Sequence, residues 1–286
     1  MKMRTFLITI INLLIINNLF SQENLNVYTY KFGDMQVSLL QEISKYDKPT
    51  VLIGLTDEIL NECAPDDTIP GAVNAFFLQA NGKNILIDSG YGTKLFDNLK
   101  FLGIGAEDID IVLLTHLHGD HISGMMKNGR KSFPNADVYL SQREHDYWLK
   151  ETEDERSHAM LSEYKDRLHT LHPNKLGEKA KDFLPGIQAY EAYGHTPGHT
   201  VYLFTSSEKQ FLIIGDVINV AAIQFPYPNI PAIYDKNAEE ASATKVIVLD
   251  FASKHNIPIA GMHISYPGMG NVTKNNKGGF IFKPMK

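Results

Sequence analysis

Cysteine is almost absent from this sequence, which contains only Cys63 among its 286 residues. A single cysteine excludes an intramolecular disulfide and a cysteine-rich structural zinc site. No unit of roughly 20–50 residues repeats, which argues against solenoids and propellers. Beyond the N-terminal segment, no apolar run reaches the roughly 18 residues that suggest a membrane span. What remains is the composition of an ordinary globular chain, with 43% hydrophobic and 21% charged residues.

The N-terminal segment has the parts of a secretory signal peptide. Lys2 and Arg4 supply the positive start, and residues 6–16 (FLITIINLLII) form a short apolar run. Leu19-Phe20-Ser21 then offers a cleavage site before Gln22. We therefore expect residues 1–21 to be a cleaved signal peptide and the protein to be secreted or periplasmic. A membrane anchor is the alternative interpretation of the same segment.

Positive charge is also scarce. The chain carries 27 Lys and Arg residues against 33 Asp and Glu residues, a formal net charge of −6. Removal of residues 1–21 takes away two positive charges and changes the net charge to −8. Because phosphate attraction needs a basic patch, nucleic acid is not an expected partner.

Hydrophobic patterning predicts alternating strands and helices along the chain. Strands are expected at 25–32, 35–41, 74–80, 84–88, 109–115, 187–192, 200–205, 210–214 and 258–260. Helices are expected at 57–63, 93–102, 142–150, 156–171 and 238–254, with the rest of 42–72 as a long loop. Strands in both hairpin and strand–helix–strand spacing predict an α/β fold in which two mixed sheets lie between outer helices. No linker is visible, so residues 22–286 are expected to form a single catalytic domain.

The most informative segment is His116-Leu117-His118-Gly119-Asp120-His121, which follows the apolar run 109–115. Side chains at i and i+2 of an extended segment project to one side, so His116 and His118 can bind one ion together. Asp120 and His121 lie on the following turn, where Gly119 frees the backbone. Histidine and carboxylate ligands without cysteine are typical of catalytic zinc sites. The alternative is a polar surface loop that happens to contain histidines.

Further metal-competent side chains stand near the ends of predicted strands. They are His195 and His199 in the segment GHTPGHT, Asp216 after the strand 210–214, and His263 after the strand 258–260. Taken alone, each has a plainer explanation as a capped, solvated or turn residue. Their order along the chain and their glycine neighbours make them ligand candidates.

With these motifs in this order, the sequence resembles the metallo-β-lactamase superfamily over essentially all of residues 27–286. The resemblance implies an αββα sandwich with two Zn²⁺ ions per chain at one edge of the sheets; manganese or cobalt are alternatives for such ligands. It implies supporting roles for His195 and for Asp88, which would orient a ligand histidine. The implied ligands are His116, His118 and His199 for one metal, Asp120, His121 and His263 for the other, and Asp216 between them.

Stretches beyond the ligands resemble the branch of N-acyl-homoserine lactonases and methyl-parathion-type hydrolases. They are residues 71–76 (GAVNAF), 133–136 (FPNA), 215–226 (GDVINVAAIQFP) and 263–268 (HISYPG). One position departs from that branch. Many homoserine lactonases place a tyrosine three residues after the bridging aspartate, where this chain has Asn219. Asparagine still donates a hydrogen bond, but the phenol is absent.

The predicted reaction is the opening of the ester ring of N-acyl-homoserine lactones, a quorum-quenching activity, by a hydroxide that bridges two zinc ions. Asp120 is the candidate catalytic residue, because a ligand carboxylate beside the nucleophile can move its proton. The pocket is expected to be apolar. Its candidate residues are Trp148, Asn219, Phe225, Tyr227, Ile230, Ile233 and the 57–70 loop, with ordinary core packing as the alternative.

Three other functions compete with the lactonase. They are an aryl-ester or organophosphate hydrolase with the same metals, an iron-dependent sulfur dioxygenase, and a binding protein that keeps its metal without catalysis. The expected partner is a small-molecule lactone or ester. A homodimer is left open, and no membrane span is expected after signal cleavage.

Overall fold

The larger of two sheets contains seven strands, in the order β1-β2-β3-β4-β5-β8-β9. The computed structural model describes residues 26–286, so the predicted signal peptide over 1–21 lies outside the described residues. Neighbours from β1 to β4 pair antiparallel, and those from β4 to β9 pair parallel. The strands are β1 (Val27–Phe32), β2 (Met35–Asp47), β3 (Ile69–Ala80), β4 (Lys83–Ile87), β5 (Ile111–Leu113), β8 (Asp137–Ser141) and β9 (Leu168–Leu171).

The smaller sheet contains six strands, in the order β10-β11-β12-β13-β14-β15. Only β12 and β13 pair parallel. The strands are β10 (Ile187–Glu191), β11 (Thr200–Ser206), β12 (Lys209–Ile213), β13 (Ile259–Ala260), β14 (Met269–Lys274) and β15 (Phe280–Pro284). A separate ribbon pairs β6 (Met126–Lys127) with β7 (Arg130–Lys131). Both main sheets are mixed, as predicted.

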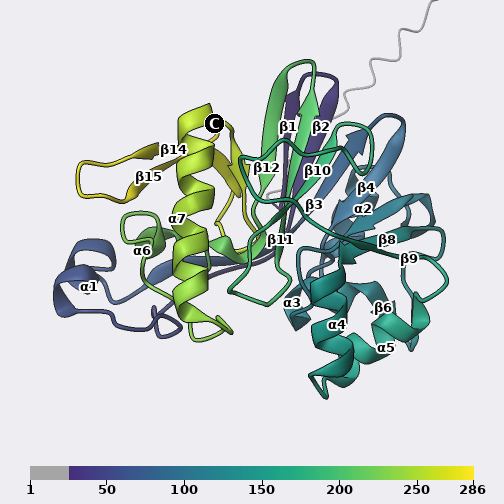
Figure 1. Ribbon diagram of the computed structural model, residues 1–286, viewed down its shortest axis with the longest axis horizontal. Helices are drawn as coiled ribbons and strands as arrows, with labels where there is room; N and C mark the ends of the chain where they lie inside the picture. The colour runs from purple at the N-terminus through teal and green to yellow at the C-terminus, as the bar shows by residue number, and fades with distance from the viewer. Residues whose placement is uncertain (1–25) are drawn as a thin grey trace, which may run out of the picture.

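Helices cover the outer faces of both sheets (Figure 1). On the larger sheet lie α2 (Leu95–Phe101), α4 (Gln142–Lys150) and α5 (Glu155–Glu163), and on the smaller sheet lies α7 (Ala238–His255). The remaining helices are α1 (Asp57–Cys63), η1 (Ala106–Asp108), α3 (Gly119–Ile122), η2 (Ser123–Met125), η3 (Gly215–Val217) and α6 (Ala221–Gln224). The predicted αββα sandwich is confirmed. No helix within residues 26–286 is long and apolar enough to cross a membrane.

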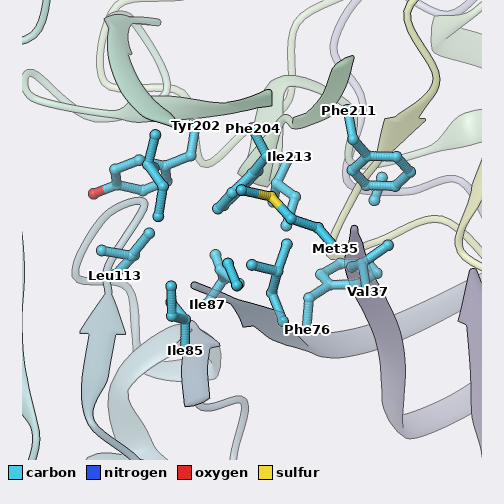
Figure 2. Packing of buried hydrophobic residues seen from close by; sticks show 14 of the residues in the cluster. Met35, Val37, Phe76, Ile85, Ile87, Leu113, Tyr202, Phe204, Phe211 and Ile213 are labelled. Carbon is cyan, nitrogen blue, oxygen red and sulfur yellow. The ribbon is translucent and has the colours of Figure 1, made fainter. Parts of the chain in front are cut away.

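The core between the sheets follows from the period-two alternation of their strands. In β3, Phe76 and Leu78 point toward the smaller sheet, whereas Phe77 points to the helices on the other face. Figure 2 shows Phe76 among side chains of both sheets, including Tyr202 and Phe204 from β11. Full burial of such a side chain contributes roughly 1.5–3 kcal/mol. This layer therefore holds the two sheets, and the loops at their shared edge, in register.

The region predicted as a long loop over 42–72 is a loop with one short helix only between the two strands, which extend into it from both ends. β2 continues to Asp47, β3 begins at Ile69, and α1 lies between them as predicted. The pairing of β2 with β3 shifts register between Gln41 and Ile43, so Glu42 forms a β-bulge. A bulge moves later side chains to the opposite face. The alternation is broken at that point, which is why sequence periodicity missed these strands.

The helix predicted over 156–171 is about half helix. α5 ends at Glu163, and residues 168–171 form β9, which pairs parallel with β8. Tyr164 is the first residue after the helix, and its buried hydroxyl accepts the Phe133 N–H and donates to the Met125 carbonyl. These contacts lie more than 30 residues away in sequence. The helical pattern was therefore overridden by tertiary contacts.

Candidate metal centre

Four loops meet at one edge of the sandwich. Three of them follow β5, β12 and β13, and the fourth precedes β11. Hydrogen bonds between the loops fix their spacing. Thr200 donates its N–H to the Thr115 carbonyl at 2.9 Å, and Met262 donates its N–H to the Gly215 carbonyl at 3.4 Å. Side chains from segments more than 140 residues apart in sequence therefore reach the same point.

The first ligand group consists of three histidines. His118 Nδ1 lies 3.0 Å from His116 Nε2 and 2.9 Å from His195 Nε2. These nitrogens are close enough together to hold one metal ion. His116 is fully buried, whereas His118 is partly accessible. As the spacing predicted, His116 and His118 converge from one extended segment.

His195, rather than the predicted His199, completes this group. His199 is fully buried, and its Nε2 accepts the backbone N–H of Asp216 at 3.0 Å. The Nδ1 of His195 lies 2.8 Å from Asp235 Oδ1, which places its proton there and turns the Nε2 lone pair toward His118. The prediction that His199 binds metal and His195 supports it is thus corrected. Sequence spacing offered two histidines in one loop without showing which ring faces the centre.

Gly215 explains how His199 fits beneath the site. It adopts φ +52°, and a Cβ there would lie 2.5 Å from His199 Nε2. We expect Gly215→Ala to lower the free energy of unfolding by about 2–4 kcal/mol, since overpacking adds to the cost of a left-handed backbone. Gly82→Ala is the matched control, because Gly82 has φ +73° with nothing within 4 Å of its Cβ. Denaturant unfolding measures both variants, and equal losses would contradict the assigned contact.

The second ligand group is built from Asp120, His121 and His263, as predicted. Asp120 Oδ1 lies 3.8 Å from His121 Nε2, and Asp120 Oδ2 lies 3.4 Å from His263 Nε2. The three side chains form a group able to hold one metal ion. Asp120 follows the turn at Gly119 and is the most accessible of the three, with 21% of its side chain exposed.

Asp216 lies between the two groups. Its Oδ1 is 3.1 Å from His121 Nε2, and its Oδ2 is 2.9 Å from His263 Nε2 and 3.3 Å from His195 Nε2. His121 Nε2 and Asp216 Oδ1 are buried and face each other at 3.1 Å, but neither atom forms a hydrogen bond of good geometry. Buried polar atoms whose hydrogen bonds are not satisfied are costly. A cation would satisfy both atoms, so these residues fit a pair of metal ions with Asp216 as the shared ligand.

Hydrogen bonds behind the ligands orient their rings. Asp88, at φ +54°, accepts from Thr115 N–H at 2.8 Å and lies 2.7 Å from His121 Nδ1. His263 Nδ1 donates to the Ala72 carbonyl at 2.8 Å. Such partners fix the tautomer of a ligand histidine. The resemblance anticipated the contact of Asp88, but Asp235 was missed because its segment carries no recognisable motif.

Burial and neighbouring charge set the protonation of the ligand histidines differently in the two groups. Burial and the neighbouring His195 lower the pKa of His118 to about 3, and burial holds the pKa of His116 well below its usual range. Burial opposes the charged form of His263, but Asp216 raises its pKa to about 9. Against the effect of burial, Asp216 likewise raises the pKa of His121 well above its usual range. His116 and His118 are therefore already neutral, as metal binding needs, whereas His121 and His263 would each release a proton on binding a metal ion.

A cavity of about 690 Å³ opens over the ligands. Its apolar wall comes from Val51, Ile69, Val73 and Val220, and Tyr91 and Tyr234 also line it. Asn219 lines it as predicted, and its amide donates to Asp216 Oδ2 at 3.1 Å. Lys45 and Lys48 line it too, but each pairs with an aspartate, Asp47 and Asp67 respectively. Sequence reasoning found none of these tyrosines and lysines.

The other predicted pocket residues lie elsewhere. Trp148 is buried and donates to Glu144, while its ring meets the His118 ring edge-on at 5.6 Å. Phe225 stacks on Phe282 under α7, and Tyr227 donates to Glu62. Ile230 and Ile233 do not line the cavity, and of the 57–70 loop only Ile69 and Pro70 do. Apolar character alone could not distinguish residues of the cavity wall from residues of the hydrophobic core, because the same residue types occur in both places.

The sandwich and the paired ligand groups at its edge define the class of this protein as a metal-dependent hydrolase. Residues 68–252 match the family described as the metallo-beta-lactamase superfamily, and the chain belongs to that superfamily. Predicted fold and family are therefore confirmed.

Solved structures of similar proteins cover nearly the whole chain. One is hydrolase AbOPH of the beta-lactamase superfamily, with a TM-score of 0.82 and 27% identity over 93% of this chain and 99% of that one. Another is AidC, a dizinc quorum-quenching lactonase with a bound homoserine product. It has a TM-score of 0.82 and 23% identity over 91% of this chain and 98% of that one, and at this identity the likeness shows the fold alone.

Curated relatives match over a shorter stretch. Ribonuclease Z of Clostridioides difficile (strain 630) is 37% identical over 73 residues, which is 25% of this chain and 23% of that protein. The exodeoxyribonuclease WalJ of Streptococcus pneumoniae (serotype 2, strain D39 / NCTC 7466) is 35% identical over 71 residues, 24% of this chain and 26% of that protein. The chain therefore spans about a quarter of the length of these relatives.

Proposed function

We propose that this protein is a two-zinc hydrolase that opens the ester ring of N-acyl-homoserine lactones. One observation carries the proposal. Two ligand groups, each able to hold a metal ion, share Asp216 on the wall of a 690 Å³ cavity. Paired metal sites of this kind serve displacement reactions at carbonyl and phosphoryl centres. A cavity of this volume lies in the range of small-molecule sites, roughly 300–1,000 Å³.

His116, His118 and His195 would hold one zinc ion, and Asp120, His121 and His263 the other, with Asp216 shared. When bound, such a pair polarises a carbonyl and lowers the pKa of water to about 7. Asp120 is the residue that we expect to accept a proton, because its carboxylate is the most accessible of the second group and lines the cavity. Asp88, Asp235 and the Ala72 carbonyl hold the ligand rings in place.

The cavity wall supports a substrate with an apolar arm. Ile69, Val73 and Val220 offer aliphatic surface beside the ligands, and Tyr91 and Tyr234 are about half exposed. An acyl chain would bury this surface, which contributes roughly 25 cal/mol per Å² removed from water. The dizinc lactonase AidC, which shares the fold, is described in complex with a hexanoyl homoserine product. These features favour an acyl lactone over a purely polar ester.

An aryl-ester or organophosphate hydrolase is the second candidate. It is favoured by Asn219, which stands where many homoserine lactonases have a tyrosine and whose amide is hydrogen-bonded to Asp216. An aromatic leaving group would also suit a cavity lined by Tyr91 and Tyr234. Nucleic acid is not proposed, since the chain has a net charge of −6 and the cavity lysines are paired with aspartates.

Metal content and substrate kinetics test this proposal together. We expect about two zinc ions per chain, and a kcat/KM for a hexanoyl homoserine lactone at least about tenfold above that for an aryl acetate or a phosphotriester, a difference of about 1.4 kcal/mol. Chelation should abolish all three activities, and added zinc should restore them. A higher kcat/KM for the aryl ester or phosphotriester would favour the second candidate, and one iron per chain without zinc would defeat both.

A further inference from the structure

Glu144 is a buried carboxylate in the first turn of α4, and four donors converge on it. Its Oε1 accepts the Leu117 N–H at 3.0 Å and the Trp148 Nε1–H at 2.6 Å. Its Oε2 accepts the Thr196 hydroxyl at 2.7 Å and the Gly198 N–H at 2.9 Å. Burial raises the pKa of Glu144, and the same four donors lower it.

These donors belong to the two loops that carry the first ligand group. Leu117 lies between His116 and His118, and Thr196 directly follows His195. One carboxylate oxygen binds the first loop, and the other binds the second loop. The two loops are about 80 residues apart in sequence, and His118 Nδ1 and His195 Nε2 nevertheless lie 2.9 Å apart.

The second loop also lies directly on α4. A Cβ at Gly198 would overlap the Glu144 backbone nitrogen. Trp148, one turn further along α4, meets the His118 ring edge-on at 5.6 Å while donating to Glu144. In Figure 1, α4 runs along the larger sheet, and α5 packs against it. A single helix face therefore contacts both histidine loops.

We propose that Glu144 is a positioning residue that sets the spacing of His118 and His195, and thereby the affinity of the first ligand group for its metal ion. This inference rests on the proposed function, because it assumes that these histidines bind zinc. Both oxygens of a carboxylate accept hydrogen bonds, and both are needed here because each oxygen accepts from two of the four donors. Glutamine has only one oxygen, so Glu144→Gln must leave one loop facing an NH₂ group.

The test measures zinc affinity by competition with a chromogenic chelator. We expect Glu144→Gln to lower the affinity for one of the two zinc ions by about 10- to 100-fold. This is the usual effect of losing a hydrogen-bond partner of a metal ligand. The affinity for the other ion should stay within about twofold of the unmodified protein. Thermal unfolding of the metal-free proteins measures the accompanying loss of stability separately.

Glu42→Gln is the matched control. Glu42 is also buried and also accepts four N–H groups: those of Tyr91 and Gly92 at Oε2, and those of Lys94 and Leu95 at Oε1. None of these four residues is a proposed ligand. We expect this variant to lose stability while both zinc affinities stay unchanged. If both variants weaken zinc equally, or if Glu144→Gln leaves both affinities unchanged, the inference fails.

Thr196→Val extends the test if Glu144→Gln does not fold. It removes one of the four donors while keeping the shape of the side chain. The same zinc ion should bind more weakly, by a smaller factor than in Glu144→Gln, and an unchanged affinity would overturn the inference. An unmodified protein that binds no zinc would instead defeat the proposed function. Zinc binding by the unmodified protein, without an effect of either variant, defeats this inference alone.

Discussion

Replacing His195 by alanine is expected to remove one of the two zinc ions and to lower kcat/KM by at least about 10³-fold. His195 Nε2 lies 2.9 Å from His118 Nδ1 and 3.3 Å from Asp216 Oδ2, at the junction of the two ligand groups. Its loss would leave the first group with two histidines. Metal-ion stabilisation is worth several kcal/mol, and each 1.4 kcal/mol is a factor of about ten in rate.

His199→Gln is the control that distinguishes the two histidines of the same loop. The amide oxygen of glutamine can take over as acceptor of the Asp216 N–H, which His199 Nε2 accepts in the structure. We expect both zinc ions to remain and stability to fall by about 1–3 kcal/mol at most, the cost of an imperfectly satisfied buried donor. Zinc analysis and unfolding measure the two effects. Loss of zinc in His199→Gln, with zinc retained in His195→Ala, would reverse the assignment.

Asp216→Asn is expected to have the other large effect. Asp216 contacts His121, His263 and His195, so it is the one carboxylate shared by both ligand groups. Asparagine keeps the shape of the side chain but removes the negative charge and one acceptor oxygen. We expect both zinc ions to bind at least about 10-fold more weakly and kcat/KM to fall by about 10³-fold or more even at saturating zinc.

The stability of metal-free Asp216→Asn separates metal binding from folding. Asp216 is buried beside histidines whose positive charge holds its pKa well below its usual range, against the effect of burial. The unfolding transition of metal-free Asp216→Asn should nonetheless stay cooperative, because Asp216 is not part of the core between the sheets. Full activity in Asp216→Asn, with two zinc ions bound, would contradict the role of Asp216 as shared ligand.

Much of the fold followed from local patterns. The alternation in 74–80 and the apolar run 109–115 predicted strands that the structure contains in β3 and β5. The bulge at Glu42 and the break after Tyr164 were not predictable in the same way. Each depends on contacts with residues far along the chain, such as the loop at 91–95 that Glu42 binds. Periodicity carries no information about such contacts.

The sequence by itself determined which chemistry is available. A cluster of histidines and aspartates without cysteine, placed after buried strands, predicted a metal centre, and six of its seven expected side chains converge with His195. Only the tertiary structure decided that His195 faces the centre while His199 supports Asp216 from beneath. It also decided which apolar residues line the cavity. The reason is physical: residue type sets what a side chain can bind, whereas its direction depends on partners, such as Asp235 and Glu144, that lie distant in the chain.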